Sequence, residues 1–289
     1  MAKQAPIART VHELRSTIAK WRENGDTVAL VPTMGSVHGG HLSLIDVAKK
    51  HASRVVASVF VNPTQFGPRE DFKRYPRDEK GDAEKLAAAR TDLVYAPSIE
   101  EMYPKGSNTS VKVVNLSDDL CGGARPQHFE GVATIVTKLL MQAAPDIAVF
   151  GEKDYQQLIV IKSLVRDLFI PVEIVGAPIV REPDGLAMSS RNVYLSAEER
   201  QRAPELFGIV SKVASDLADG RGCDDASGSA RFKLEATGFR VDYVAVRDAA
   251  TLDPLSGPVK VPARVLAAVY LGATRLIDNV AVRPKNKGK

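Results

Sequence analysis

The residue types best suited to chemistry gather in one short segment, Pro32–His41, which reads Pro-Thr-Met-Gly-Ser-Val-His-Gly-Gly-His. His38 and His41 are three positions apart, so in the first turn of a helix they would share a face. Small residues around them would let the backbone approach a ligand, and a helix start would offer N–H groups to a phosphate. Two imidazoles here can donate hydrogen bonds to phosphate oxygens. The alternative is a glycine-rich turn with incidental histidines, although two of the chain's five histidines fall in these four positions.

Two further segments carry groups that suit a phosphate. Gly151–Gln157 reads Gly-Glu-Lys-Asp-Tyr-Gln-Gln, and a lysine at a helix start can neutralise phosphate charge as a point cation. Gln157 would lie one turn after Lys153 and point the same way. Met188–Asn192 holds two serines before Arg191, a set that suits a mobile loop closing over a triphosphate. The alternatives are an ordinary charged helix start for the first segment and a polar connector for the second.

Neutral polar groups occur in Val61–Phe66, where Asn62 and Gln65 could hydrogen-bond a small polar substrate. This pattern is weak by itself because Asn-Pro commonly starts a turn. Arg125 and His128 could border the same site, and a structural loop is the alternative for both.

Strand and helix patterns alternate through the first two-thirds of the chain and would position these motifs. Apolar runs predict strands at 27–31, 55–61, 92–96, 147–150 and 172–175, and helical spacing predicts helices at 11–21, 42–51, 78–90, 128–142 and 155–169. This rhythm predicts an α/β fold with a doubly wound parallel sheet. Such sheets bind ligands at the carboxyl ends of their strands, and the motifs at 32–41, 61–66 and 151–157 each follow a predicted strand.

The last third of the chain predicts a second, smaller α+β domain. A helix is expected at 204–216, strands at 241–246 and 265–270, and a loop rich in glycine, serine and aspartate at 220–228. We place the boundary between a domain of residues 1–182 and a C-terminal domain of residues 183–289.

Composition narrows the class of protein. Of 289 residues, 44% are hydrophobic and 26% charged, which is the balance of a folded globular chain. A net charge of +4 suits anionic substrates, but no basic patch interleaved with aromatic residues predicts nucleic-acid binding. The two cysteines, Cys121 and Cys223, lack the spacing of a zinc site or a disulfide framework. No apolar run approaches the roughly 20 residues of a membrane span, and no signal peptide opens the chain, so we expect a cytoplasmic protein.

Taken together and in order, the motifs resemble those of the pantoate–β-alanine ligase (pantothenate synthetase) family over nearly the whole chain. The resemblance rests on Pro32–His41, Val61–Phe66, Tyr75-Pro-Arg77, Met102-Tyr-Pro104, Arg125–Phe129, Gly151–Gln157 and Met188–Asn192. The first is similar to the HIGH signature of adenylate-forming Rossmann enzymes, and Met188–Arg191 resembles its KMSKS counterpart.

The resemblance implies a Rossmann-like enzyme that condenses pantoate with β-alanine. ATP would be used through a pantoyl adenylate, with release of AMP and pyrophosphate and with magnesium accompanying the nucleotide. The C-terminal domain would close over ATP. The partners would be these small molecules and a second copy of the chain in a homodimer, with neither nucleic acid nor membrane involved.

The resemblance also implies roles for individual residues. The ATP ligands would be Met34, Gly35, Ser36, Val37, His38, Gly39, Gly40, His41, Gly151, Glu152, Lys153, Asp154, Val180, Met188, Ser189, Ser190 and Arg191. The catalytic groups would be His41 as proton donor, His38, Lys153, Ser189, Ser190 and Arg191. Gln65 and Gln157 would bind pantoate, Gln65 would also help to place β-alanine, and Asn62 joins them as a substrate ligand.

Two departures from the family pattern stand out. Position 39 is glycine where the family commonly has glutamate. The acidic cluster after Tyr75-Pro-Arg77 is thin, and only Asp82 sits where an acidic metal contact is expected. We therefore expect magnesium to be held mainly by ATP oxygens and water.

Two other functions compete with this interpretation. A nucleotidylyltransferase of the same superfamily would transfer AMP to a phosphate and stop there. A nucleic-acid-binding protein is the second alternative, suggested by the basic balance alone. Neutral ligands such as Gln65 and Gln157 favour a carboxylate substrate over a phosphate.

Overall fold

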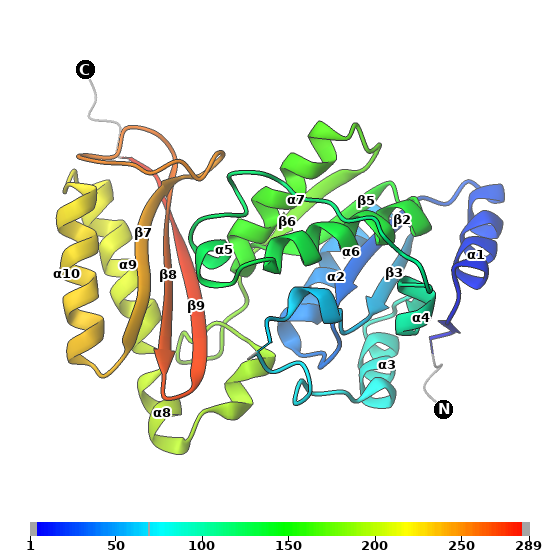
Figure 1. The fold of residues 1–289 in the computed structure, drawn as a ribbon, viewed down its shortest axis with the longest axis horizontal. Helices are drawn as coiled ribbons and strands as arrows, with labels where there is room; N and C mark the ends of the chain where they lie inside the picture. The colour runs from blue at the N-terminus through cyan, green and yellow to red at the C-terminus, as the bar shows by residue number, and fades with distance from the viewer. Residues whose placement is uncertain (1–4, 69, 285–289) are drawn as a thin grey trace. The chain divides into compact units, whose positions relative to one another are not determined.

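The computed structural model describes residues 5–68 and 70–284. The chain divides into two compact units, Met1–Glu152 with Val160–Pro178 and Lys153–Ile159 with Ile179–Lys289. The first is built on a six-stranded sheet and the second on a three-stranded sheet (Figure 1). The boundary expected between residues 182 and 183 stays a prediction. No helix in the described ranges is both long enough and apolar enough to cross a membrane.

Six parallel strands form the sheet of the first unit and confirm the predicted doubly wound α/β fold. The order is β1-β4-β3-β2-β5-β6. The strands are β1 (Ile7–Ala8), β2 (Val28–Thr33), β3 (Arg54–Val59), β4 (Leu93–Tyr95), β5 (Ile147–Gly151) and β6 (Glu173–Ala177). Strands β2 to β5 are mainly apolar and buried on both faces, as parallel strands covered by helices must be. Because β3 and β4 lie on one side of β2 while β5 and β6 lie on the other, the winding reverses between β2 and β5.

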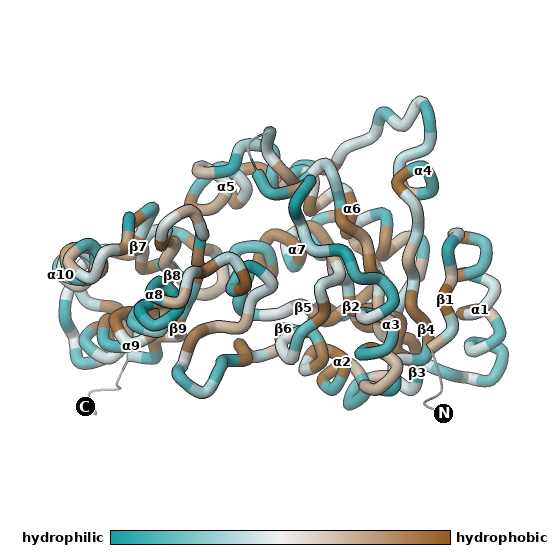
Figure 2. Tube along the Cα trace, turned by 90° about the horizontal axis from the view of Figure 1, so that it is seen from below, coloured by the Kyte–Doolittle hydropathy of each residue, from teal (hydrophilic) through white to brown (hydrophobic). Residues whose placement is uncertain are grey.

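Helices cover both faces of this sheet. They are α1 (Val11–Glu23), α2 (Gly39–His51), α3 (Glu79–Ala88), α4 (Ile99–Met102), α5 (Cys121–Ala124), α6 (His128–Ala143) and α7 (Tyr155–Asp167), with 3-10 helices η1 (Pro63–Gln65) and η2 (Glu152–Asp154). A capping box opens α1: Thr10 Oγ1 accepts from Glu13 N at 3.2 Å, and the Glu13 carboxylate accepts from Thr10 N at 3.1 Å. Figure 2 shows β2 and β5 between α6 on one side and α2 on the other, with apolar segments along these elements.

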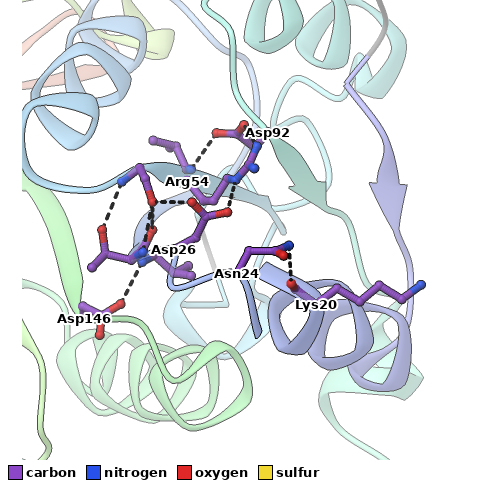
Figure 3. Close-up of polar contacts among 10 residues, drawn as sticks. Lys20, Asn24, Asp26, Arg54, Asp92 and Asp146 are labelled. Carbon is purple, nitrogen blue, oxygen red and sulfur yellow. Dashed lines mark hydrogen bonds and ion pairs between the residues drawn. The ribbon is translucent and has the colours of Figure 1, made fainter. Parts of the chain in front are cut away.

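Carboxylates hold the amino ends of the strands (Figure 3). Asp146 accepts from the first N–H of β2 at 2.7 Å, and Asp92 accepts from an N–H of β3 at 2.8 Å. Arg54 donates to Asp26 at 2.7 Å and to Asp92 at 3.3 Å. These bonds fix the amino ends of β2 and β3. The loops that leave the carboxyl ends of the same strands therefore begin from fixed points.

The second unit packs two helices on one face of an antiparallel sheet (Figure 1). The sheet order is β7-β8-β9, with β7 (Arg240–Asp248), β8 (Ala263–Leu271) and β9 (Thr274–Val282). The other elements are η3 (Ser190–Tyr194), α8 (Ala197–Arg202), α9 (Glu205–Ala218) and α10 (Cys223–Ala236). Buried side chains such as Leu206, Leu234 and Val265 fill the space between helices and sheet. The predicted smaller α+β domain is confirmed, although β9 was not among the predicted strands.

The prediction of a loop at 220–228 is wrong from residue 223 onward, because α10 begins there. Its buried positions, Cys223, Ala226, Ala230 and Leu234, recur at helical spacing and face the core. Two aspartates lie in its first turn, where negative charge favours a helix. Within this helix, the glycine and serine residues that suggested a loop occupy exposed or half-buried positions.

A substitution at Gly228 tests directly whether α10 is a helix. Gly228 is exposed in α10, and a Cβ added there would meet no atom within 4 Å. We expect Gly228→Ala to raise the free energy of unfolding by about 0.5–1 kcal/mol, because alanine loses less backbone freedom on folding. Urea denaturation measures this change, and a lower free energy of unfolding would contradict α10.

Gly220 is the matched control for this substitution. A Cβ added at Gly220 also meets no atom within 4 Å, but its φ is +100°. Gly220→Ala should therefore lower the free energy of unfolding by about 1 kcal/mol, since a side chain is strained at that φ.

Candidate active site

The loops at the carboxyl ends of four adjacent strands carry most of the predicted motifs. In the order β4-β3-β2-β5, β2 leads into the histidine loop, which we define as residues 34–41. Strand β3 leads into Asn62 and Gln65, β4 leads through α4 to Tyr103, and β5 ends at Gly151. The histidine loop and Gly151 thus leave the two strands that flank the reversal of winding, where doubly wound sheets bind ligands.

The two imidazoles cap the start of α2. His38 is the N-cap residue, and its Nδ1 accepts a hydrogen bond from Gly40 N at 3.1 Å. His41 Nδ1 accepts one from the backbone N of His38 at 3.3 Å, and the ring centroids are 4.1 Å apart. A ring nitrogen that accepts carries no proton, so each neutral imidazole has its proton on Nε2. The helix cap therefore fixes both rings as Nε2–H donors, the form that can hydrogen-bond a phosphate oxygen.

A buried carboxylate holds the histidine loop. Asp82 is 1% exposed, and its two oxygens accept hydrogen bonds of 2.7 Å from the backbone N–H groups of Ser36 and Val37. The backbone passes so close that a Cβ on Gly35, whose φ is +80°, would lie 2.8 Å from Asp82 Oδ2. Lys85, one turn further along α3, donates to the Val37 carbonyl at 2.9 Å. Helix α3 therefore fixes the path of the loop.

These contacts bear on the prediction that Asp82 binds magnesium. Each of its oxygens already accepts a backbone hydrogen bond. Within residues 5–68 and 70–284, no group of three or more His, Cys, Asp or Glu side chains could hold a metal ion. A divalent cation held by protein side chains alone would need such a group, whereas magnesium bound with a nucleotide commonly takes only one or two carboxylates. The structure gives Asp82 a role in loop geometry, and metal binding by Asp82 stays a prediction.

Asn62 is hydrogen-bonded at both ends of its buried side-chain amide. Its Nδ2 donates to Gln65 Oε1 at 3.0 Å and to a carbonyl of α6 at 3.1 Å. Its Oδ1 accepts from Tyr103 Oη at 2.8 Å and from Thr64 Oγ1 at 3.0 Å. Gln65 Nε2 in turn lies 3.1 Å from Met34 Sδ of the histidine loop. Asn62 thus positions Gln65, while its direct contact with a substrate stays a prediction.

An ion pair and a histidine hold the main chain of Gln65. Arg125 donates to the two Glu70 oxygens at 2.7 and 2.5 Å, and its Nη1 lies 2.9 Å from His128 Nε2. His128 Nδ1, 2.8 Å from the Gln65 carbonyl oxygen, donates to it, which leaves Nε2 to accept from Arg125. Burial would raise the pKa of the Glu70 carboxyl, but the Arg125 guanidinium outweighs burial and holds that pKa below its usual range. Of the two alternatives from the sequence, the structure favours support of Gln65.

In the second unit, Lys153 is held through its carbonyl. Asn279 Nδ2 of β9 donates to Lys153 O at 2.9 Å, and Arg264 Nη1 of β8 donates to Asn279 Oδ1 at 3.0 Å. Burial lowers the pKa of the Lys153 ammonium, nearby aspartates act in the opposite sense, and Arg191 lowers the pKa further. A phosphate near this ammonium would favour its charged form again.

The predicted flap Met188–Arg191 belongs to a loop with several internal hydrogen bonds. Met188 N donates to the Val180 carbonyl at 3.0 Å. Ser189 Oγ caps η3 by accepting from Arg191 N at 3.3 Å, and Asn192 Nδ2 donates to a Glu182 oxygen at 2.9 Å. Contact between a nucleotide and Val180 stays a prediction, and so do the roles of Ser190 and of the mobile flap.

The predicted site residues form two sets. In the first unit lie the histidine loop, Asn62, Gln65, Asp82 and residues 151–152, with direct contacts that join the histidine loop to Gln65 and to Asp82. In the second lie Lys153, Asp154, Gln157, Val180 and Met188–Arg191. Within this second set Lys153 and Arg191 interact electrostatically. Lys153 lies in η2 and Gln157 in α7, and their pointing the same way stays a prediction.

Sequence reasoning missed four residues that support the site. Tyr103 stood in a quoted motif, Met102-Tyr-Pro104, but received no role there. Thr64, Glu70 and Asn279 carried no signal of their own. The partner of Thr64, Asn62, is two positions away, whereas those of Glu70 and Asn279 come from distant parts of the chain. Strand β9, which holds Asn279, was not predicted.

Known proteins are similar to this chain in sequence and in fold. Residues 6–281 match the family model described as pantoate-beta-alanine ligase. A pantothenate synthetase of Rhodospirillum rubrum is 55% identical over 278 residues, which cover 96% of this chain and 99% of that protein. The crystal structure of a pantothenate synthetase from Thermus thermophilus matches with a TM-score of 0.91 and 47% identity, over 96% of this chain and 100% of that one.

A second similar solved structure is described as a complex with ligands. The pantoate-beta-alanine ligase of Francisella tularensis, complexed with beta-gamma ATP and beta-alanine, matches with a TM-score of 0.80 and 33% identity. The match covers 96% of this chain and 97% of that one. With a strand-end histidine loop of this geometry and relatives matched along nearly their full length, the chain belongs to the pantoate–β-alanine ligase family.

Proposed function

We propose that this chain condenses pantoate with β-alanine to pantothenate at the expense of ATP, through a pantoyl adenylate. It thereby acts as an AMP-forming carbon–nitrogen ligase of pantothenate biosynthesis. The observation that carries the proposal is the pair of Nε2–H imidazole donors at the start of α2, beside the reversal of winding. Family membership names the substrates that such a phosphate-directed site would serve.

ATP is needed because a carboxylate is a poor electrophile toward an amine. In the first step a pantoate carboxylate oxygen attacks the α-phosphorus of ATP, the bond from that phosphorus to the bridging oxygen breaks, and pyrophosphate leaves. In the second step the uncharged β-alanine amine attacks the acyl carbon, loses a proton and expels AMP. Exclusion of water between the steps protects the adenylate from hydrolysis.

The first unit supplies neutral hydrogen-bond donors. The histidine loop would contact ATP, with the Nε2–H groups of His38 and His41 on phosphate oxygens whose charge grows during transfer. Gln65 would bind pantoate and help to place β-alanine. Most of the catalytic effect would come from positioning, because no covalent intermediate with the protein is required.

The second unit supplies the cations. Lys153 and Arg191, with the hydroxyls of Ser189 and Ser190, would stabilise the transferring group and the departing pyrophosphate. Gln157 would bind pantoate. Asp154, the backbone at Val180 and Met188 would contact ATP, as would Gly151 and Glu152 of the first unit.

Magnesium is proposed as the companion of ATP and not as a resident of the protein. It would be held by phosphate oxygens and water, as magnesium commonly is, because the described residues offer it no ligand cluster. We further propose a cytoplasmic homodimer that works on small molecules, without nucleic acid or membrane, as the family resemblance implies.

An assay that omits one component at a time tests the function. Only the complete mixture of ATP, pantoate and β-alanine should release AMP with pantothenate, while ATP and pantoate alone should form pyrophosphate and an enzyme-bound adenylate. A stable adenylylated product without AMP release would instead indicate a nucleotidylyltransferase.

His41→Ala should lower the rate of pyrophosphate formation by roughly 10²–10³, the usual loss for one preorganised donor. His41→Gln is the matched variant, because glutamine at this helix position can still accept from the N-cap backbone N–H. It should keep the thermal stability of the wild type and lose rate to a similar extent. Rapid-quench kinetics measure the rate, and a His41→Ala rate within a few fold of wild type would remove His41 from the mechanism.

Asp82→Asn separates loop geometry from metal binding. An amide can accept from only one of the two loop N–H groups, so the free energy of unfolding should fall by about 1–3 kcal/mol. The magnesium concentration for half-maximal activity should stay unchanged. Asp78→Asn is the control: Asp78 caps α3 by accepting from Gly81 N, and asparagine is an equally good cap. An increased magnesium requirement at unchanged stability would restore Asp82 as a metal ligand.

A further inference from the structure

The Asn62 amide has one orientation because the Thr64 N–H, near its oxygen, can only donate and the Gly131 carbonyl, near its NH₂ group, can only accept. Tyr103 Oη donates to Oδ1 at 2.8 Å, Thr64 Oγ1 at 3.0 Å and Thr64 N at 3.3 Å. A flipped amide would place its NH₂ group against the Thr64 N–H and its oxygen against the Gly131 carbonyl. The oxygen of Asn62 must therefore face Tyr103 and Thr64, and its NH₂ group must face the other way.

The orientation of Asn62 sets that of Gln65. Asn62 Nδ2 donates to Gln65 Oε1 at 3.0 Å and to the Gly131 carbonyl at 3.1 Å. If Gln65 were flipped, two NH₂ groups would face each other. Gln65 Nε2 consequently points away from Asn62 and lies 3.1 Å from Met34 Sδ of the histidine loop. The side chain is thus fixed as a donor toward that loop.

The chain of contacts from Tyr103 through Asn62 and Gln65 to Met34 runs across the carboxyl ends of three neighbouring strands. Tyr103 follows β4, Asn62 follows β3 and Met34 follows β2, and these strands are adjacent in the sheet. Pantoate offers carboxylate and hydroxyl oxygens, which accept hydrogen bonds. A glutamine that binds it at the histidine loop should therefore present N–H and not C=O.

We propose that Tyr103 is a positioning residue for pantoate, which acts through Asn62 to hold the Gln65 amide with its N–H donors toward the substrate. This inference rests on the proposed function and names a residue that holds its substrate ligand in place through the hydrogen bond to Asn62 Oδ1. The hydroxyl keeps its proton, since burial raises the pKa of Tyr103 against the opposing effect of its hydrogen bonds.

Tyr103→Phe is a clean deletion of the hydroxyl. The ring keeps its packing, with its centroid 6.4 Å from that of Phe60 and 5.2 Å from Lys138 Nζ. We expect the KM for pantoate to rise roughly 3–10-fold, the loss of one neutral hydrogen bond. The KM for ATP and the thermal midpoint should stay at wild-type values.

Tyr95→Phe is the matched control. It removes another phenol hydroxyl from the same strand region, one that donates to Gln142 Oε1 at 3.1 Å and does not contact Asn62. Its KM for pantoate should stay at the wild-type value. Thr64→Val removes the second hydroxyl donor to Asn62 and should reproduce the Tyr103→Phe effect, so the proposal can be tested even if one variant fails to fold.

A double-mutant cycle with Gln65→Ala decides whether Tyr103 acts through Gln65. In the Gln65→Ala background, Tyr103→Phe should leave the pantoate KM unchanged, because the side chain that it positions is gone. Equal multiplication of KM in both backgrounds, an unchanged pantoate KM in the single variant, or a parallel rise in the ATP KM would each overturn the proposal. A wild-type enzyme that makes no pantothenate would instead overturn the proposed function itself.

Discussion

The histidine loop depends on the Asp82 carboxylate. A loop with glycine at 35, 39 and 40 has many backbone conformations open to it, and the start of a helix does not by itself select one. Two backbone hydrogen bonds to a buried charged acceptor do so, because such bonds are stronger than neutral ones and no water replaces them there. Once the path is set, His38 becomes the N-cap of α2 and both imidazole tautomers follow from the cap.

The kinds of donor in the two units suit different partners in the proposed reaction. Neutral N–H groups from His38, His41 and Gln65 can orient oxygens without forming an ion pair that would weaken the pantoate carboxylate as a nucleophile. Lys153 and Arg191 are cationic side chains, the kind that would suit the pyrophosphate that leaves in the proposed reaction. The lowered pKa of Lys153 shows that its burial opposes its charge, and a bound phosphate would recover part of that cost.

Local patterns predicted the parts of this protein that local physics determines. The buried strands and the strand-to-helix position of the histidine loop both follow from residues close in sequence. The helix α10 was missed because its buried face consists of small residues, Cys223, Ala226 and Ala230, which carry little hydrophobic signal. Tyr103 could not be assigned because its partner Asn62 is 41 positions away. Partners at such distances are brought together by strand order, which periodicity does not encode.

Glycine at position 39 affects both the charge and the backbone freedom at the start of α2. It is the first residue of α2, and the first turn of that helix contains no acidic residue. The family commonly has glutamate there, whose carboxylate would interact with the positive end of the helix. Without it, the start of α2 has no side-chain carboxylate in its first turn to offset its positive end. The cost is added backbone freedom next to His38, which the Asp82 hydrogen bonds offset by fixing Ser36 and Val37 just before it. If the loop binds phosphate as proposed, glycine at this position and the hydrogen bonds of Asp82 on α3 act together.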